Sequence, residues 1–154
     1  MTTPLEKLRQ YGYELPQPKA PVASYIPTTR VGNLIYVSGQ ISIDANDEVI
    51  EGRLGDTMNV VQGGNAAELC AVNVLAQLVH SANVRLEDIT QVVKLTIFVA
   101  SAPDFHDQHL VANGGSNLII GVLGDKGKHA RSAIGVPGLP RGAAVEIEAI
   151  VEVA

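Results

Sequence analysis

The sequence is poor in cysteine and in aromatic residues. Its 154 residues include a single cysteine, Cys70, and no tryptophan, and aromatic residues make up only 4% of the chain. One cysteine excludes an intramolecular disulfide. The hydrophobic residues, 46% of the chain, are therefore mainly aliphatic, and we expect an aliphatic core. We interpret Cys70 as a small core residue within a predicted helix, rather than as a reactive thiol.

Long hydrophobic runs and clusters of positive charge are also scarce. The longest apolar runs are far too short to span a bilayer, and residues 1–9 lack the apolar centre of a signal peptide, so we expect a cytoplasmic protein. Eleven Lys and Arg residues against 16 Asp and Glu residues give a net charge of -5. The basic residues are scattered, apart from one local cluster at 126–131, so we expect neither nucleic acid nor a membrane as a partner.

Length and hydrophobic periodicity predict one domain with two main helices. A chain of this size is typical of one domain, which we place at 1–154, with a short helix and a proline-containing extended connector within 1–20. Apolar residues at helical spacing predict a helix over 65–82, with Asn65 as its N-cap, and a second helix over 104–122.

Two pairs of adjacent glycines fall near these helices. Gly63 and Gly64 are expected to break the chain ahead of the first helix. Gly114 and Gly115 lie inside the second, where each costs about 1 kcal/mol relative to alanine. Either the second helix is interrupted there, or the glycines allow close backbone packing.

Alternating apolar and polar residues predict a sheet. The expected strands are 25–30, 33–42, 90–100, 129–136 and 143–153. The first two are expected to form a hairpin, because the link between them contains Gly and Asn. Two helices packed on one face of a mixed sheet give an α+β fold. The other face carries apolar residues among charged ones, which suggests association with other copies of the chain.

The strongest candidate chemistry lies in the last 26 residues. Arg131 falls in a predicted strand, a Pro/Gly connection follows at 137–142, and Glu146 and Glu148 fall in the last strand. If the two strands are neighbours, Arg131 approaches one of these acids. The pair is then either a structural ion pair or part of a site. In a site, the guanidinium grips a carboxylate with two hydrogen bonds and a glutamate positions water.

Four segments, in this order, resemble the reactive-intermediate deaminase (Rid, or YjgF-like) family, which also carries the name endoribonuclease L-PSP. They are Tyr-Val-Ser-Gly-Gln-Ile at 36–41, 65–76, 92–105, and Ala-Arg-Ser through Glu-Ile-Glu-Ala-Ile at 130–150. The resemblance implies a fold like that of the small trimeric chorismate mutases, with clefts between the subunits of a homotrimer. It also implies hydrolysis of enamines and imines, such as 2-aminoacrylate, to 2-keto acids and ammonia, without metal or organic cofactor.

The resemblance also implies roles for particular residues. Arg131 matches the family's carboxylate-binding arginine, and Glu146 matches the glutamate linked to the catalytic water. Tyr25, Gly39 and Phe105 match positions that line the cleft.

Three positions depart from the family pattern. Ala133 stands where many members have cysteine, His129 stands where proline is common, and an asparagine of the second helix is replaced near His109. We treat Ala133 as lining the substrate site, and His109 and His129 as lining it and able to donate to an anion. His106 and His109 would share a helix face, but no further ligands complete a metal pattern, so no metal site is predicted.

Two alternatives to a deaminase stay open. One is a non-catalytic trimer that binds small carboxylates or has a regulatory role. The other is a ribonuclease, an activity attributed to some members, although the scattered positive charge argues against it.

Overall fold

The computed structural model describes residues 1–21 and 23–154. Helices α1, α2 and α3 span Pro4–Gln10, Val60–His80 and Gln108–Leu123. Strands β1 to β5 span Thr28–Val31, Leu34–Ile41, Ile89–Ala100, Ala130–Val136 and Val145–Val153. Short 3-10 turns lie at Leu86–Asp88, Gly124–Gly127 and Pro140–Gly142. Within the described residues, no helix combines the length and hydrophobicity needed to cross a membrane.

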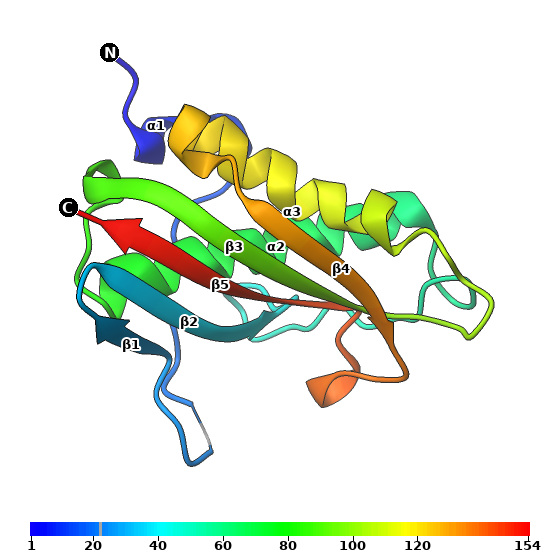
Figure 1. Ribbon diagram of the computed structural model, residues 1–154. Coiled ribbons are helices and arrows are strands. Elements are labelled where there is room, and N and C mark those ends of the chain that lie inside the picture. The colour runs from blue at the N-terminus through cyan, green and yellow to red at the C-terminus, as the bar shows by residue number, and fades with distance from the viewer. Residues whose placement is uncertain (22) are drawn as a thin grey trace.

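The five strands form one mixed sheet in the order β1-β2-β5-β3-β4. Strands β3 and β4 are parallel, and the other neighbours are antiparallel. Helices α2 and α3 lie together against one face of this sheet, as Figure 1 shows. The predicted α+β class, with two helices on one face of a mixed sheet, is confirmed.

The alternation of β5 divides the sheet into a core face and an open face. Val145, Ile147 and the other odd-numbered residues of the strand are buried beneath the helices. Glu146 and Glu148 point to the open face, where they pair in register with Phe98 and Thr96. Exposed apolar side chains on this open face are Val31, Tyr36 and Ile134. The predicted mixture of charged and apolar residues on one face is therefore present.

Helix α2 begins earlier than the periodicity suggested. Asn59, not Asn65, is its N-cap: the Asn59 side chain accepts from the Gln62 backbone N–H at 2.9 Å, and the Gln62 side chain accepts from the Asn59 N–H at 2.9 Å. This reciprocal capping box starts the helix at Val60. The prediction that Gly63 and Gly64 precede the helix was wrong.

The glycines inside the helices allow α2 and α3 to pack backbone against backbone. Helix α3 starts at Gln108, later than predicted, and runs without interruption through Gly114 and Gly115. A Cβ atom on Gly114 would overlap the carbonyl group of Gly64, and one on Gly115 would lie 3.2 Å from the Ala67 carbonyl oxygen. Of the two alternatives for Gly114 and Gly115, close packing is therefore confirmed.

The N-terminal segment begins with the expected short helix. Thr3 and Glu6 form a capping box at the start of α1, and Leu8 is buried. Helix α1 packs on α3, where the Tyr11 hydroxyl occupies the space that a side chain on Gly121 would fill. Residues 12–21 of the connector then lie outside the sheet (Figure 1).

Candidate functional site

Arg131 extends from β4, at the edge of the sheet, toward helix α3. Its Nη1 donates to Asn113 Oδ1 at 3.0 Å and to Ser116 Oγ at 3.1 Å, and its Nη2 donates to the His109 carbonyl oxygen at 3.3 Å. All three acceptors are uncharged. None of the ion pairs formed among residues 1–21 and 23–154 includes Arg131. The half-buried guanidinium is therefore held in place while its charge stays uncompensated.

The condition under which Arg131 would approach an acid of the last strand is not met. Strand β3 lies between β4 and β5, so the Pro/Gly connection at 137–142 does not join neighbouring strands. The crossover through α3 makes β4 a parallel partner of β3, which leaves β4 at the edge of the sheet. The structural ion pair that the sequence left open is therefore absent from the described residues.

His129 supports Arg131 through the hydroxyl of Ser116. Its Nδ1 donates to the Gly127 carbonyl oxygen at 2.6 Å, so Nε2 is free to accept from the Ser116 hydroxyl, 2.9 Å away. Burial lowers the pKa of His129 below its usual value, and the nearby positive charge of Arg131 lowers it further. Both nitrogens of the neutral ring therefore take part in hydrogen bonds, and His129 is positioned to orient the Ser116 hydroxyl.

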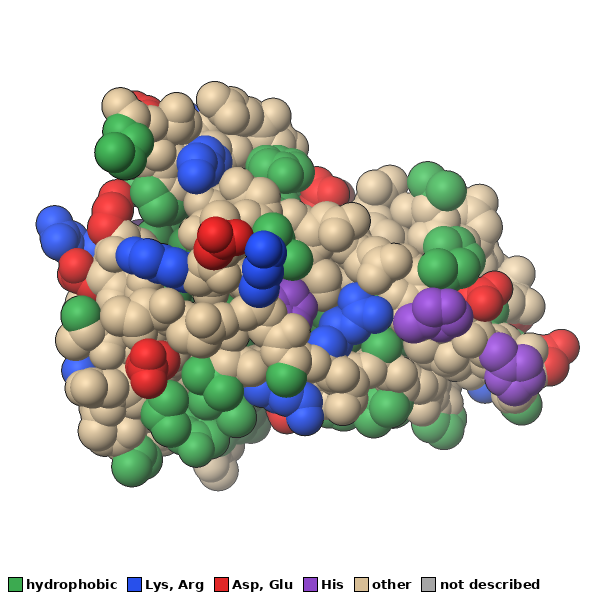
Figure 2. Space-filling view, turned by 45° about the horizontal axis from the view of Figure 1, so that its top comes forward, with side chains coloured by type: hydrophobic (Ala, Val, Ile, Leu, Met, Phe, Trp, Pro, Cys, Tyr) green, Lys and Arg blue, Asp and Glu red, His purple; other side chains and the backbone are tan. Residues whose placement is uncertain are grey.

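The other predicted residues of this region gather along the boundary between β4 and α3. Ala133 follows Arg131 on the same face of β4, and His109, whose side chain is exposed, lies in the first turn of α3. Figure 2 shows basic and histidine side chains gathered across this part of the surface. His106 was expected to share a helix face with His109, but it precedes α3 and lies outside the helix. No group of three or more potential metal ligands occurs within the described residues.

Tyr25, Gly39 and Glu146 meet in a separate cleft of about 460 Å³. Gly39 sits where the register of β2 shifts between Val37 and Gln40. A side chain on Gly39 would overlap the Glu146 carboxylate, so the glycine makes room for this acid. Burial raises the pKa of Glu146, and the neighbouring charge of Glu148 raises it further. A raised pKa brings a carboxyl group closer to the range useful for proton transfer near neutral pH.

Arg131 and Glu146 do not converge within one copy of the chain. Arg131 pairs in register with the buried Leu95 and points to the helix side of the sheet. Glu146 pairs with Phe98 and points to the open side. The two groups of predicted site residues therefore lie on opposite faces of the sheet, one around Arg131 and one around Glu146.

No pattern in the sequence indicated the ionic cluster that lies beside the Glu146 cleft. Asp47 Oδ1 lies 3.1 Å from Arg141 Nη1, and Asp47 Oδ2 lies 3.3 Å from Lys19 Nζ. These three residues line the cleft, and they tie the N-terminal connector to the loop between β4 and β5. Because they are far apart in the sequence, only the folded chain brings them together.

Asn113 and Ser116 were also missed as partners of Arg131. They are three residues apart on α3, so they share one helix face. This spacing was available in the sequence, but the glycines between them suggested a break in the helix. Asn113 lies one turn beyond His109 on the same helix.

Comparison with known proteins gives consistent matches over almost the whole chain. The pattern of the family described as Endoribonuclease L-PSP matches residues 16–153. Protein TCP17 of Trypanosoma cruzi is 42% identical over 146 residues, covering 94% of this chain and 91% of its own length. The 2-iminobutanoate/2-iminopropanoate deaminase of Rattus norvegicus is 36% identical over 135 residues, covering 86% of this chain and 83% of its own length.

A solved structure matches at both the sequence and the fold level. The crystal structure of Atu1372 from Agrobacterium tumefaciens, described as a protein with unknown function, superposes with a TM-score of 0.92 and 47% identity. The match covers 99% of this chain and 94% of that one. The chain therefore belongs to the endoribonuclease L-PSP family, which is the family of the Rid, or YjgF-like, proteins.

Proposed function

We propose that this chain is an imine and enamine deaminase that hydrolyses small 2-imino or 2-enamino acids to 2-keto acids and ammonia. Arg131 binds the substrate carboxylate, and Glu146 acts on the attacking water. We further propose that residues 1–154 form one domain of a cytoplasmic homotrimer and that no cofactor is needed. Relatives of 30–36% identity that carry the name 2-iminobutanoate/2-iminopropanoate deaminase support this class of reaction.

The uncompensated charge of Arg131 is the observation that carries the proposal. Asn113, Ser116 and the His109 carbonyl fix the guanidinium but do not neutralise it. A guanidinium forms its strongest hydrogen bonds with a carboxylate, which it can bind through two parallel N–H groups. A preorganised cation of this kind selects an anionic ligand and fixes its orientation for the reaction.

Imine hydrolysis requires only water and proton transfers. Water adds its oxygen to the imine carbon while the imine nitrogen gains a proton. The hydroxyl proton of the resulting carbinolamine is then transferred to its amino group, which leaves as ammonia while the C=O bond of the ketone forms. Glu146 has a pKa raised by burial, so it is suited to accept a proton from the attacking water and return it to the departing nitrogen.

A complete site requires residues from two copies of the chain. Arg131 and Glu146 lie on opposite faces of one sheet, so a single copy does not present both to one ligand. Proteins of the YjgF family are typically homotrimers. We therefore propose that Arg131 and Ala133 of one subunit face Tyr25, Gly39 and Glu146 of the next.

The reaction can be tested with an imine generated in the assay. An amino-acid oxidase acting on 2-aminobutanoate supplies 2-iminobutanoate, and the purified protein is expected to accelerate its conversion to 2-oxobutanoate and ammonia. Arg131→Gln is expected to abolish this acceleration, whereas Arg30→Gln, which removes an exposed charge from β1, is expected to retain it.

Two results would contradict the proposal. One is a rate equal to that of a buffer control for a folded trimer. Ligand binding that depends on Arg131, without turnover, would instead support the non-catalytic carboxylate-binding alternative.

A further inference from the structure

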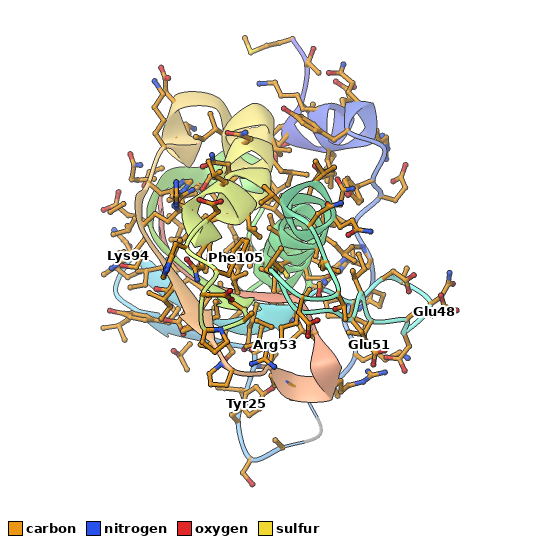
Figure 3. All side chains as sticks on the ribbon, turned by 90° about the vertical axis from the view of Figure 1, so that its right-hand side faces the viewer. Tyr25, Glu48, Glu51, Arg53, Lys94 and Phe105 are labelled. Atoms are coloured by element: carbon orange, nitrogen blue, oxygen red, sulfur yellow. The ribbon has the colours of Figure 1, made fainter. Side chains whose placement is uncertain are left out.

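A second concavity, of about 420 Å³, lies at the end of the sheet where β3 and β4 finish. Its polar and aromatic lining residues are Arg53, Ser101, Phe105, His106 and Gln108. No Asp or Glu belongs to the lining. Figure 3 looks onto this end of the molecule and shows Arg53 and Phe105 there, on the side that faces the viewer. The pocket therefore carries a positive charge without an acid in its walls.

Arg53 has hydrogen-bonding capacity that the chain does not use. Its Nε is buried and has no hydrogen-bond partner among the described residues. Its guanidinium also takes part in none of the ion pairs found in that part of the chain. A buried donor without a partner destabilises the protein, and the cost is larger for a charged group. Arg53 lines the pocket, so an anion bound there would compensate the charge of its guanidinium and offset part of this cost.

The rest of the pocket suits a carboxylate on a small organic molecule. Gln108 Nε2 donates to the Phe105 carbonyl oxygen at 2.8 Å, and it lies 3.5 Å from Ser101 Oγ. The absence of a side chain at Gly135 leaves room for this amide, because a Cβ there would lie 2.7 Å from Gln108 Nε2. Phe105 and the prolines beside it supply apolar walls. Apolar walls with a few polar groups are typical of small-molecule sites.

The pocket adjoins the region of Arg131. Arg131, Ala133 and Gly135 alternate along one face of β4, which places Gly135 about 13 Å from Arg131 along the strand. The Arg131 guanidinium reaches toward α3 and bonds the His109 carbonyl oxygen, and His109 follows the pocket residue Gln108 directly. The two arginines therefore flank one stretch of surface between β4 and the start of α3.

We propose that this pocket binds a second acidic group of the substrate, so that the natural substrate is a 2-imino dicarboxylate rather than a simple 2-imino monocarboxylate. Arg131 holds the carboxylate next to the imine carbon, and Arg53 holds the distal carboxylate. This inference deepens the proposed function and rests on it. It assigns Arg53 a role in specificity rather than in the chemical step.

Binding of the keto-acid products tests this inference without requiring turnover. Calorimetric titration of the full-length protein would use 2-oxoglutarate as the dicarboxylate and 2-oxobutanoate as the monocarboxylate. Wild type is expected to bind 2-oxoglutarate about tenfold more tightly, the effect of one additional charge-assisted hydrogen bond. Arg53→Gln is expected to remove this difference and to leave 2-oxobutanoate binding unchanged, whereas Arg131→Gln is expected to weaken both ligands.

The possible outcomes separate the specificity proposal from the proposed function. Equal affinity of wild type for the two ligands, or unchanged 2-oxoglutarate binding by Arg53→Gln, would overturn the second site while leaving Arg131 as the anchor. If Arg53→Gln bound neither ligand and Arg131→Gln bound both as wild type does, both proposals would be overturned. Arg30→Gln is the charge-matched control, and it is expected to bind both ligands as wild type does.

A thermal unfolding curve distinguishes a specificity role of Arg53 from a structural one. Because its Nε has no partner, Arg53→Gln is expected to leave the melting temperature unchanged or to raise it. A melting temperature that falls by several degrees, together with reduced binding of both ligands, would show that Arg53 supports the fold and would overturn the specificity proposal.

Discussion

Arg131 and Glu146 project from opposite faces of the same sheet. Arg131 extends to the helix side and is held there by Ser116, whereas Glu146 lies on the open side above Gly39. The guanidinium and the carboxylate of one copy are thus kept from neutralising each other. Each remains available to a ligand, or to the complementary face of another copy.

Replacing Glu146 with Gln is expected to raise the stability of the protein and to abolish its activity. Because the pKa of Glu146 is raised above 4.5, folding becomes less favourable as the pH rises through 4.5 toward the pKa of the folded protein. Glu146→Gln removes this cost, so its melting temperature at about pH 7 is expected to exceed that of wild type, while the two converge at about pH 4. Imine hydrolysis is expected to be lost.

The matched control for this prediction is Glu152→Gln, on the exposed face of the same strand. It is expected to retain hydrolysis and to show no comparable gain in melting temperature. A Glu146→Gln variant less stable than wild type at neutral pH would show that the carboxylate stabilises the fold, contrary to this account.

His129 is expected to make stability depend on pH in a mildly acidic range. Its pKa is lowered from 6.5 in the folded protein, so the unfolded chain takes up a proton first as the pH falls. The neutral ring therefore contributes stability that is present above about pH 6.5 and is lost as the pH falls below it. His129→Gln is expected to show a smaller drop in melting temperature than wild type between about pH 7 and pH 5.

His80→Gln, at the exposed end of α2, is the control, and it is expected to keep the wild-type slope. If His129→Gln also kept the wild-type slope, burial and the charge of Arg131 would not be holding the ring in its neutral form.

Two glycines that face each other across α2 and α3 are expected to respond oppositely to alanine. A Cβ on Gly64 meets nothing within 4 Å, so Gly64→Ala is expected to stabilise the protein by up to about 1 kcal/mol through helix propensity. A Cβ on Gly114 would overlap the Gly64 carbonyl, so Gly114→Ala is expected to destabilise it by about 1–3 kcal/mol. Urea unfolding at one fixed protein concentration measures both, and equal effects would contradict the observed helix contact.

Local patterns predicted most of the secondary structure. The period-2 alternation of β5 is a local property, and it correctly separated Val145 and Ile147 from Glu146. The start of α2 was also encoded locally, by Asn59 followed by Gln62, but the pair Gly63 and Gly64 suggested a break. Glycine was favoured there by contact with another helix, and a contact between distant segments leaves no periodic signal.

The arrangement of the site depended on non-local information. The resemblance to the family indicated Arg131, and the alternation placed Glu146 and Glu148 on one face. The order of the strands in the sheet, however, decides whether Arg131 meets an acid. Strands β4 and β5 are consecutive in the sequence, but β3 lies between them in the sheet. The pocket around Arg53 is lined by segments that are distant in the sequence and meet only in the folded chain, so no local pattern pointed to it.

Activity in mixed trimers tests the shared site most directly. Arg131→Gln and Glu146→Gln proteins, each inactive alone, would be unfolded together in equal amounts and refolded. If each site takes Arg131 from one subunit and Glu146 from the next, random assembly leaves about a quarter of the sites intact, so we predict about a quarter of the wild-type rate of 2-iminobutanoate hydrolysis. A mixture as inactive as its two parents, with mixed trimers confirmed by mass spectrometry, would contradict the account.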